Sequence, residues 1–342
     1  MKDNLYLKWL SSKTNSIYWH DSAIAQEVEQ AIANGACGMT TNPFLCGATL
    51  QSTPEFWQAE LAQLPESKLE KPEQLISMVV RHYANRLSEF RTAGFGKGYC
   101  CAQTNPCKPG DAAYMLEQAK RYAKIASNIV IKLPATRSGI EAIEECAALG
   151  LNVAATVSFT VPQVLAVAEA IQRGFKRARQ NGLKPGLGIA VLMVGRLDDY
   201  LRDVMQDTHA AATEDDIIWA GTAAIKRAYR IFNERNYECV LMPAGCRGGY
   251  HITELAGAKM IMSIAPKIAA QLESLDESVC VEKIDEDVAP EIIDRLCSMR
   301  EFRKAYEPNG MELDDFITFG SCNRTLDQFV NDGWNVLNAI KC

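Results

Sequence analysis

The sequence predicts an α/β fold: a (β/α)8 TIM barrel with an insert after strand 2 and a helical C-terminal extension. Short apolar segments alternate with helical patterns from about residue 16 to 272. There are eight such units in about 250 residues, the number and length typical of a (β/α)8 barrel. This alternation implies a parallel sheet with right-handed crossovers. We therefore expect a single barrel domain over 1–342, with its core at about 16–272 and the extension at 273–342.

The strand candidates are mostly apolar along their whole length, as strands buried on both faces are. They are residues 16–21, 38–42, 97–103, 128–135, 151–159, 188–194, 237–244 and 258–264. An open doubly wound sheet is the alternative arrangement. It lacks a dinucleotide fingerprint, because the one glycine-rich candidate, residues 94–98, precedes a strand instead of following one.

Helical patterns fill the stretches between these strands. Asp21 or Ser22 can cap a helix after the first strand, and Ser138 can cap the helix after the fourth, which Gly150 would end. Residues 50–92 indicate a polar insert with prolines, followed by a long helix. The other clear amphipathic helices are predicted at 111–125, 162–181 and 215–233.

The amino-acid composition excludes some classes of binding partner. Hydrophobic residues make up 48% and charged residues 23% of 342 residues, so the chain can bury a large core. The net charge of −6 argues against nucleic-acid and anionic-membrane binding, because both need a basic surface. The first 16 residues lack the apolar core of a signal peptide, and the longest apolar run, 187–194, is too short to span a bilayer. We expect a cytoplasmic protein without a membrane segment.

Twelve cysteines are the least usual feature of the composition. A reducing compartment would keep them as thiols, and no pair has the C-x-x-C spacing of a zinc ribbon or a redox motif. We expect most of them to be small buried core residues and predict no metal site.

Lys132 is the first candidate for chemistry. It lies inside the apolar segment NIVIKLPA, where an ammonium group is costly to desolvate. Burial favours the neutral amine, which is the nucleophile that forms a Schiff base with a carbonyl substrate. A lysine paired with a carboxylate, or one that extends to the barrel rim, is the alternative.

Two further sets of residues follow predicted strands. Asp21 ends the first strand and can be either a general acid/base or a helix N-cap, whereas His20 beside it would face the other side. Arg196 and Arg247 follow the sixth and seventh strands, and two arginines near a glycine-rich loop suit a phosphate. Salt bridges to Asp198 or Asp199 are the alternative role for these arginines.

His251 follows the glycine-rich loop and is open to either a structural or a functional role. His82 and His209 are expected at the surface.

Four segments resemble the transaldolase family of class I, Schiff-base aldolases. They are TTNPFL at 40–45, the lysine segment at 129–163, VGRLDD at 194–199 and the arginine loop at 242–272. The stretch REFRKAYEPNGMELDDFITFG is similar to tails of longer transaldolases, so the likeness spans nearly the whole chain.

The resemblance implies a barrel enzyme that needs no cofactor besides its own lysine. Lys132 resembles the Schiff-base lysine and Asp21 the general acid/base, and Thr156 resembles the threonine that holds the catalytic water. The resemblance also implies the residues that bind the substrate. They are Asn42 and Thr41, Arg196 and Arg247 as a phosphate clamp, Gly245 in the phosphate loop, and Met193, which directly precedes the segment VGR.

Several positions depart from the family's pattern. Gln103 stands where transaldolases have a glutamate that activates water, and glutamine is what the related fructose-6-phosphate aldolases have there. Glutamine can orient a water but cannot take its proton. Met193 replaces an aromatic residue, and Val191, Ala154 and Gly245 replace polar ones, so the polar wall around the substrate is thinner.

The expected function is transfer of a dihydroxyacetone unit between sugar phosphates through a Lys132 Schiff base. The alternative, motivated by Gln103, is a fructose-6-phosphate aldolase-like lyase that releases dihydroxyacetone. A non-catalytic sugar-phosphate-binding barrel and a cysteine-based redox or metal protein are the rivals from other classes. The expected partners are a small sugar phosphate and, because family members range from dimers to rings, further copies of the chain.

Overall fold

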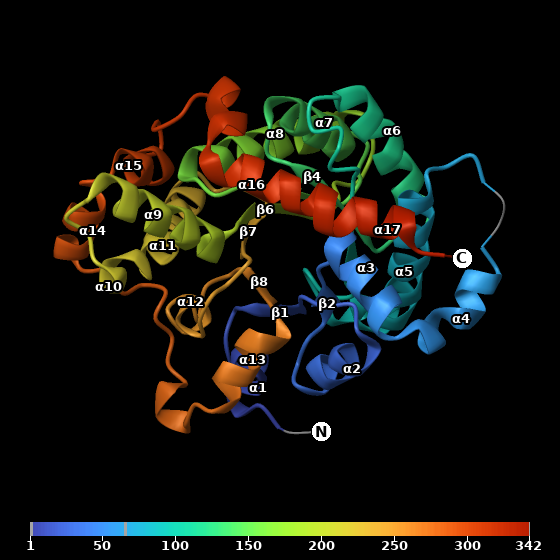
Figure 1. The fold of residues 1–342 in the computed structure, drawn as a ribbon, viewed down its shortest axis with the longest axis horizontal. Helices are drawn as coiled ribbons and strands as arrows, with labels where there is room; N and C mark the ends of the chain where they lie inside the picture. The colour runs from blue at the N-terminus through green and yellow to red at the C-terminus, as the bar shows by residue number, and fades with distance from the viewer. Residues whose placement is uncertain (1–2, 65–66, 342) are drawn as a thin grey trace.

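The barrel predicted from the sequence is confirmed in the computed structural model, which describes residues 3–64 and 67–341 (Figure 1). Eight parallel strands form one sheet in the order β7-β6-β5-β4-β3-β2-β1-β8. Strand β1 pairs with β8, Ile17 opposite Ile261 and Trp19 opposite Ser263, so the first and last strands meet and the sheet curves into a nearly closed barrel.

All eight predicted strands are present, each shorter than its apolar segment. They are β1 Ile17–His20, β2 Gly38–Met39, β3 Tyr99–Gln103, β4 Ile129–Pro134, β5 Val153–Thr156, β6 Gly188–Leu192, β7 Val240–Pro243 and β8 Ile261–Ile264. Almost every strand residue is buried, because the barrel interior covers one face and the surrounding helices cover the other.

Helices surround the barrel and extend beyond it. Those of the barrel and its insert are α1 Leu5–Lys13, α2 Ala25–Ala33, α3 Pro43–Ser52, α4 Pro54–Ala62, α5 Lys71–Leu87, η1 Ser88–Ala93, α6 Ala112–Ala123, α7 Arg137–Ala148, α8 Val161–Gln180, α9 Val194–Thr208, α10 Glu214–Ile217, α11 Ala220–Glu234, α12 Tyr250–Thr253 and α13 Pro266–Glu273. Those of the extension are η2 Glu277–Val279, α14 Pro290–Leu296, α15 Arg300–Tyr306, η3 Leu313–Thr318, α16 Gly320–Gln328, the π-helical η4 Phe329–Trp334 and α17 Asn335–Ala339.

The predicted helix boundaries need three corrections. Thr136, not Ser138, caps α7: its side chain accepts the amide proton of Gly139. Helix α2 begins only at Ala25 without a side-chain cap, so neither Asp21 nor Ser22 caps it. The helix predicted at 215–233 is two helices, α10 and α11, because the chain makes a separate turn at 218–219.

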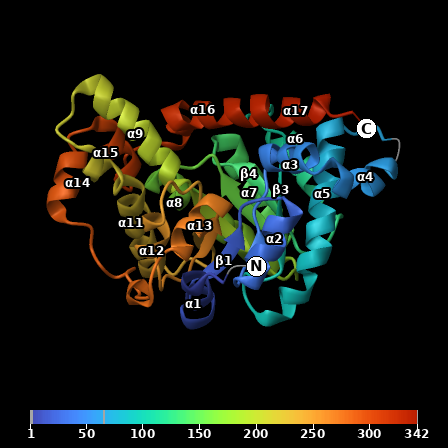
Figure 2. The ribbon, with the colours of Figure 1, turned by 60° about the horizontal axis from the view of Figure 1, so that its bottom comes forward.

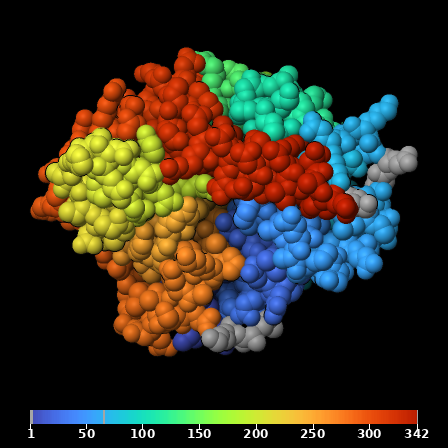
Figure 3. Space-filling model, in the orientation of Figure 1, coloured from blue at the N-terminus to red at the C-terminus, as the bar shows by residue number. Residues whose placement is uncertain are grey.

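The C-terminal extension lies against the barrel in two places. Helices α14 and α15 pack beside α10 and α11 at the periphery, and α16, η4 and α17 form one rod across the carboxyl end of the barrel (Figures 1 and 2). Gly333 fits closely over α3, since a Cβ there would come within 2.7 Å of the Phe44 amide nitrogen. Figure 3 shows the rod spanning this face of the molecule, which is hollowed beside it.

The cysteines are mainly core residues, as predicted. Seven of the eleven described cysteines are buried and all eleven are free thiols, whereas Cys342 lies outside the described residues. Across residues 3–64 and 67–341, no group of three or more metal-ligating side chains lies together, and no helix is both long and apolar enough to cross a membrane.

The ion pair that ties α14 to α10 supports a prediction about stability. Arg295 binds the buried Asp216 through two contacts, at 2.6 and 2.9 Å, and lowers the pKa of that carboxyl from 3.8 to about 2. Asp216→Asn should therefore lower the free energy of unfolding by about 2 kcal/mol at pH 6. The loss should shrink as the pH falls from about 4 to about 2, because the native carboxylate is then protonated as well. Urea unfolding at pH 6 and pH 3 measures both values.

The exposed pair of Asp287 with Arg230 provides the matched control. Asp287→Asn should change the free energy of unfolding by less than about 1 kcal/mol at either pH. Equal losses for the two variants would contradict the role given to Asp216.

Candidate active site

A cavity of about 460 Å³ opens at the carboxyl ends of the strands. In a (β/α)8 barrel this end carries the groups that act on substrates. Eight of the ten residues predicted for the site line it: Asp21, Asn42, Lys132, Thr156, Met193, Arg196, Gly245 and Arg247. Residues from the ends of seven strands and from the C-terminal rod thus meet in one place, although they lie up to more than 300 positions apart in the sequence.

Lys132 lies on β4 at the floor of the cavity and is 7% exposed. Its Nζ atom donates to the carbonyl oxygen of Thr41, 3.2 Å away. Within the described part of the chain, no carboxylate forms a salt bridge with this amine, so the alternative of a paired structural lysine is not supported. The amine is held by a neutral acceptor and faces the cavity.

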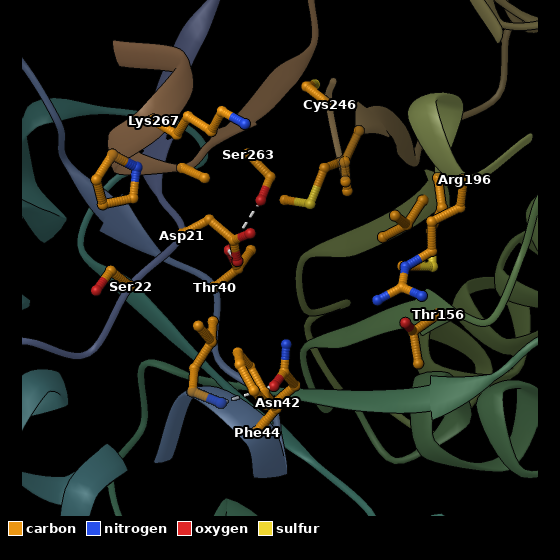
Figure 4. A pocket seen from close by; sticks show the side chains of 18 of the residues that line it. Asp21, Ser22, Thr40, Asn42, Phe44, Thr156, Arg196, Cys246, Ser263 and Lys267 are labelled. Atoms are coloured by element: carbon orange, nitrogen blue, oxygen red, sulfur yellow. Dashed lines mark hydrogen bonds between the residues drawn. The ribbon is translucent and has the colours of Figure 1, made fainter. Parts of the chain in front are cut away.

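Asp21 follows β1 and is oriented by a chain of hydroxyl groups. Thr40 Oγ1 donates to Asp21 Oδ1 at 2.6 Å and lies 2.8 Å from Ser263 Oγ. Because the Thr40 proton is used toward Asp21, Ser263 is the donor in the second contact. Figure 4 shows these three side chains together on one side of the cavity. The carboxylate is thereby fixed in the cavity wall instead of capping a helix.

Two predicted site residues, Gln103 and Thr41, are not among those that line the cavity. Gln103 is paired in register with Lys132 on the neighbouring strand, is 2% exposed, and its Oε1 has no hydrogen-bond partner among the described residues. Thr41 is fully buried and its hydroxyl donates to the carbonyl of Cys101 at 2.7 Å. Gln103 therefore faces the barrel interior beside the lysine, and Thr41 contacts the lysine amine through its backbone carbonyl.

Thr156 lines the cavity at the end of β5, where the backbone is strained. The next residue, Val157, has a φ of 54°, which β-branched residues rarely adopt. The buried Gln163 donates to the carbonyl oxygens of Val157 and Ala135, at 3.1 and 3.2 Å, and holds this turn in place. The strain is thus offset by a specific side chain, and Thr156 keeps a defined position.

The two arginines differ in their partners. Arg247 is exposed, binds the Asp199 carboxylate at 2.7 Å and donates to the carbonyl of Gly245 at 2.9 Å. Arg196 lies 5.9 Å over the ring of Phe329 on the C-terminal rod, and burial lowers its pKa. The salt-bridge alternative is thus realised for Arg247, whereas within residues 3–64 and 67–341 Arg196 makes no carboxylate pair.

Two buried side chains, His251 and Asp198, lie against the loop that carries Arg247. His251 and Asp198 are both fully buried, with Nε2 and Oδ2 2.9 Å apart, and Asp198 Oδ1 accepts the amide proton of Gly221 at 2.8 Å. The amide of Arg247 donates to His251 Nδ1 at 3.2 Å, so in a neutral ring the proton lies on Nε2, the atom 2.9 Å from Asp198 Oδ2. His251 is therefore a positioning group, and burial raises the pKa of Asp198.

Asp198→Asn should be strongly destabilising. The two oxygens of Asp198 face His251 Nε2 and the Gly221 amide, which are both donors. Asparagine has one oxygen and one NH2 group, so in either orientation its NH2 group faces one of these buried donors, which then has no acceptor. We expect a loss of about 2–3 kcal/mol in the free energy of unfolding, measured with urea. Asp199→Asn, one residue away on a half-exposed pair, should cost less than about 1 kcal/mol. The reverse order would contradict this assignment.

The other histidines play no part in the cavity. His20 is the last residue of β1, is buried with Nδ1 3.3 Å from the Tyr18 hydroxyl, and burial lowers its pKa to about 4. His82 is partly buried beside Glu60, and His209 is an exposed residue after α9.

Several lining residues were missed from the sequence. Thr40 and Ser263 orient Asp21, Lys267 lines the same side, and Phe329 contacts Arg196 from the C-terminal rod. Ser263 could have been found, because it is the one polar side chain inside the otherwise apolar segment IMSI. Phe329 could not, because nothing in its neighbourhood shows where the tail folds back.

Comparison with known proteins gives one family and a set of relatives. The family model described as transaldolase/fructose-6-phosphate aldolase matches residues 18–339. A transaldolase of Thiobacillus denitrificans is 24% identical over 237 residues, 66% of this chain and 64% of that protein. A transaldolase of Arthrobacter sp. is 28% identical over 208 residues, 58% of this chain and 55% of that protein. The matched stretches thus span less than two thirds of these relatives.

Proposed function

The chain belongs to the transaldolase/fructose-6-phosphate aldolase family, and from this premise we propose that it catalyses a Schiff-base aldol transfer between sugar phosphates. The unit transferred is a three-carbon ketone of the dihydroxyacetone type. The single observation that carries the proposal is the buried Lys132 amine, which faces the cavity without a carboxylate partner in the described residues. Its chemistry needs neither a metal nor a nucleotide, because the imine itself is the electron sink.

The proposed reaction begins at Lys132. Its neutral amine adds to the carbonyl carbon of a ketose, and loss of water from the adduct gives a protonated imine. Asp21 takes the proton of the C4 hydroxyl, the C3–C4 bond breaks, and its electron pair passes into the imine to give an enamine. An aldehyde leaves. The enamine then attacks an acceptor aldehyde, Asp21 returns the proton to the new hydroxyl, and water releases the product from Lys132.

The remaining site residues take binding and water-handling roles in this proposal. Gln103 lies opposite Lys132 on β3 and Thr156 lies opposite Pro134 on β5, and we assign these two side chains to the water that adds to the imine. Asn42, whose Oδ1 accepts the amide proton of Leu45 and so caps α3, offers its amide N–H to substrate hydroxyls. Arg196 and Arg247 bind the phosphate group.

The second candidate is a lyase that releases the free ketone. Gln103 favours it, because a glutamine cannot accept a proton from the water that returns the enzyme to its free state. This alternative uses the same imine and the same Asp21. It differs in that the enamine is protonated and hydrolysed without an acceptor.

One assay separates the candidates. The protein is incubated with fructose 6-phosphate, with and without erythrose 4-phosphate, and ketone and aldehyde products are quantified. Turnover that requires the acceptor supports transfer, whereas acceptor-independent accumulation of dihydroxyacetone supports the lyase. Binding of the sugar phosphate without any turnover or borohydride-trapped adduct would contradict both and leave a sugar-phosphate-binding barrel.

A further inference from the structure

We infer that Gln328, on the C-terminal rod, donates its side-chain amide N–H to the phosphate group of the substrate. The inference rests on the proposed function, since it adds a third group to the phosphate site of Arg196 and Arg247. It gives a binding role to a segment that lies outside the barrel. The argument starts from the way in which one face of α16 contacts Arg196.

One face of α16 packs around Arg196. Ser321 Oγ donates to the carbonyl oxygen of Arg196 at 3.4 Å, and Arg196 Nη1 donates to Thr325 Oγ1 at 3.5 Å. The guanidinium carbon lies 5.9 Å from the centre of the Phe329 ring. Ser321 and Thr325 are 2% and 1% exposed, so these contacts are shielded from solvent and hold the arginine against the rod.

Gln328 belongs to the same face of the rod. Residues 321, 325, 328 and 329 follow the spacing i, i+4, i+7 and i+8, which places them along one side of a helix. Gln328 and Phe329 line the cavity together with Arg196, and Gln328 is half-buried there. Among the residues that the structure describes, the Gln328 amide has no hydrogen-bond partner. Its N–H groups are therefore available to a ligand that binds beside the arginine.

The charges at this end of the cavity favour an anion. Arg196 has no carboxylate partner in the described part of the chain, and burial and the nearby Arg247 both lower its pKa. Figure 4 shows Asp21 on the opposite side of the cavity from Arg196. A phosphate group has three strong acceptor oxygens, so it can bind both arginines and still accept a further hydrogen bond. The amide of Gln328 supplies that donor without adding another positive charge.

Inorganic phosphate is the probe that tests this contact, because it carries no sugar hydroxyls. Its inhibition constant is measured against turnover of fructose 6-phosphate by the full chain and by Gln328→Leu. We expect the constant to rise about tenfold or more in Gln328→Leu, the usual effect of removing a donor from a charged acceptor. KM for fructose 6-phosphate should rise by a similar factor. The yield of the borohydride-trapped dihydroxyacetone adduct on Lys132 should change by less than about twofold, because that ketone carries no phosphate.

Two further variants separate the loss of the donor from a disturbance of the rod. Gln328→Lys keeps an N–H donor at this position and should hold the phosphate inhibition constant within about threefold of the starting value. Asn323→Leu makes the same change from amide to leucine at an exposed position of α16 that does not line the cavity. It should leave all of these values within about twofold of those of the unaltered chain.

Each contrary result has its own meaning. An unchanged phosphate constant in Gln328→Leu overturns the inference even if KM for fructose 6-phosphate rises, because Gln328 then contacts the sugar and not the phosphate. A loss in Gln328→Lys or Asn323→Leu as large as that in Gln328→Leu overturns it too, since the rod itself is then disturbed. Phosphate that fails to inhibit the unaltered chain also overturns the inference. An unaltered chain with neither turnover nor an adduct on Lys132 overturns the proposed function on which the inference rests.

Discussion

Replacing Lys132 by alanine is expected to lower aldol turnover by more than about 10⁴-fold and to abolish borohydride-trapped adducts. The amine is the group that becomes the imine nitrogen, so no neighbouring side chain can take over its role. The barrel should still fold, because alanine leaves the apolar surroundings of β4 intact and removes a buried amine whose described contact is one carbonyl. Turnover of fructose 6-phosphate and intact-mass analysis after reduction measure the two effects.

Lys267 offers the matched control, because it lines the same cavity but is exposed on the first turn of α13. Lys267→Met should retain the adduct, and peptide mapping should locate that adduct at Lys132. An adduct that survives in Lys132→Ala, or one that maps to Lys267, would contradict the assignment of the reactive amine.

The second large effect is expected at Arg196. Arg196→Met should lower kcat/KM for a phosphorylated substrate by about 100-fold, because a charge-assisted contact to phosphate is typically worth about 1.5–3 kcal/mol. This guanidinium has no carboxylate partner among the described residues, and Thr325 and Phe329 hold it toward the cavity. Methionine keeps much of its length and its contact with the Phe329 ring. Steady-state kinetics with fructose 6-phosphate gives the value.

Arg247→Gln provides the comparison for this prediction. Arg247 is exposed and already bound to Asp199, so its loss should cost less, about tenfold in kcat/KM. Activity toward unphosphorylated dihydroxyacetone or hydroxyacetone should change by less than about threefold in either variant. A uniform loss on phosphorylated and unphosphorylated substrates would mean that Arg196 supports the structure of the site instead of binding phosphate.

The strands could be predicted because their signal is local. An apolar run such as NIVIKLPA must be buried on both faces, and the sequence shows where each run lies. The capping residues were harder to predict. Thr136 and Ser138 both lie at the start of α7, Thr136 as the N-cap and Ser138 already inside the first turn, and the position of the start is set by packing of Gly139 against the carbonyl of Pro134.

Site residues could be predicted where a single polar residue stands in or directly after an apolar strand. They were missed where the site depends on contacts between segments that are far apart in the sequence. Lys132, Asp21 and Arg196 each stand out from their own strand. The sequence does not show which aspartate pairs with Arg247. Asp198 and Asp199 are adjacent in the sequence, but their side chains point about 100° apart on the helix, and only the packing of that helix decides which one faces the arginine. One is buried against His251 and the other reaches Arg247. The contact of Phe329 with Arg196 depends on the path of the tail, which no local pattern specifies.

The C-terminal rod has a consequence for the order in which the cavity is assembled during synthesis. Strand β8 must leave the ribosome before β1 can pair along its second edge, and the rod follows only after residue 319. A nascent chain that ends there contains all eight strands, yet it lacks Phe329 and the helix that covers α3. The cavity therefore receives its last lining residues only after every strand of the barrel has been synthesised.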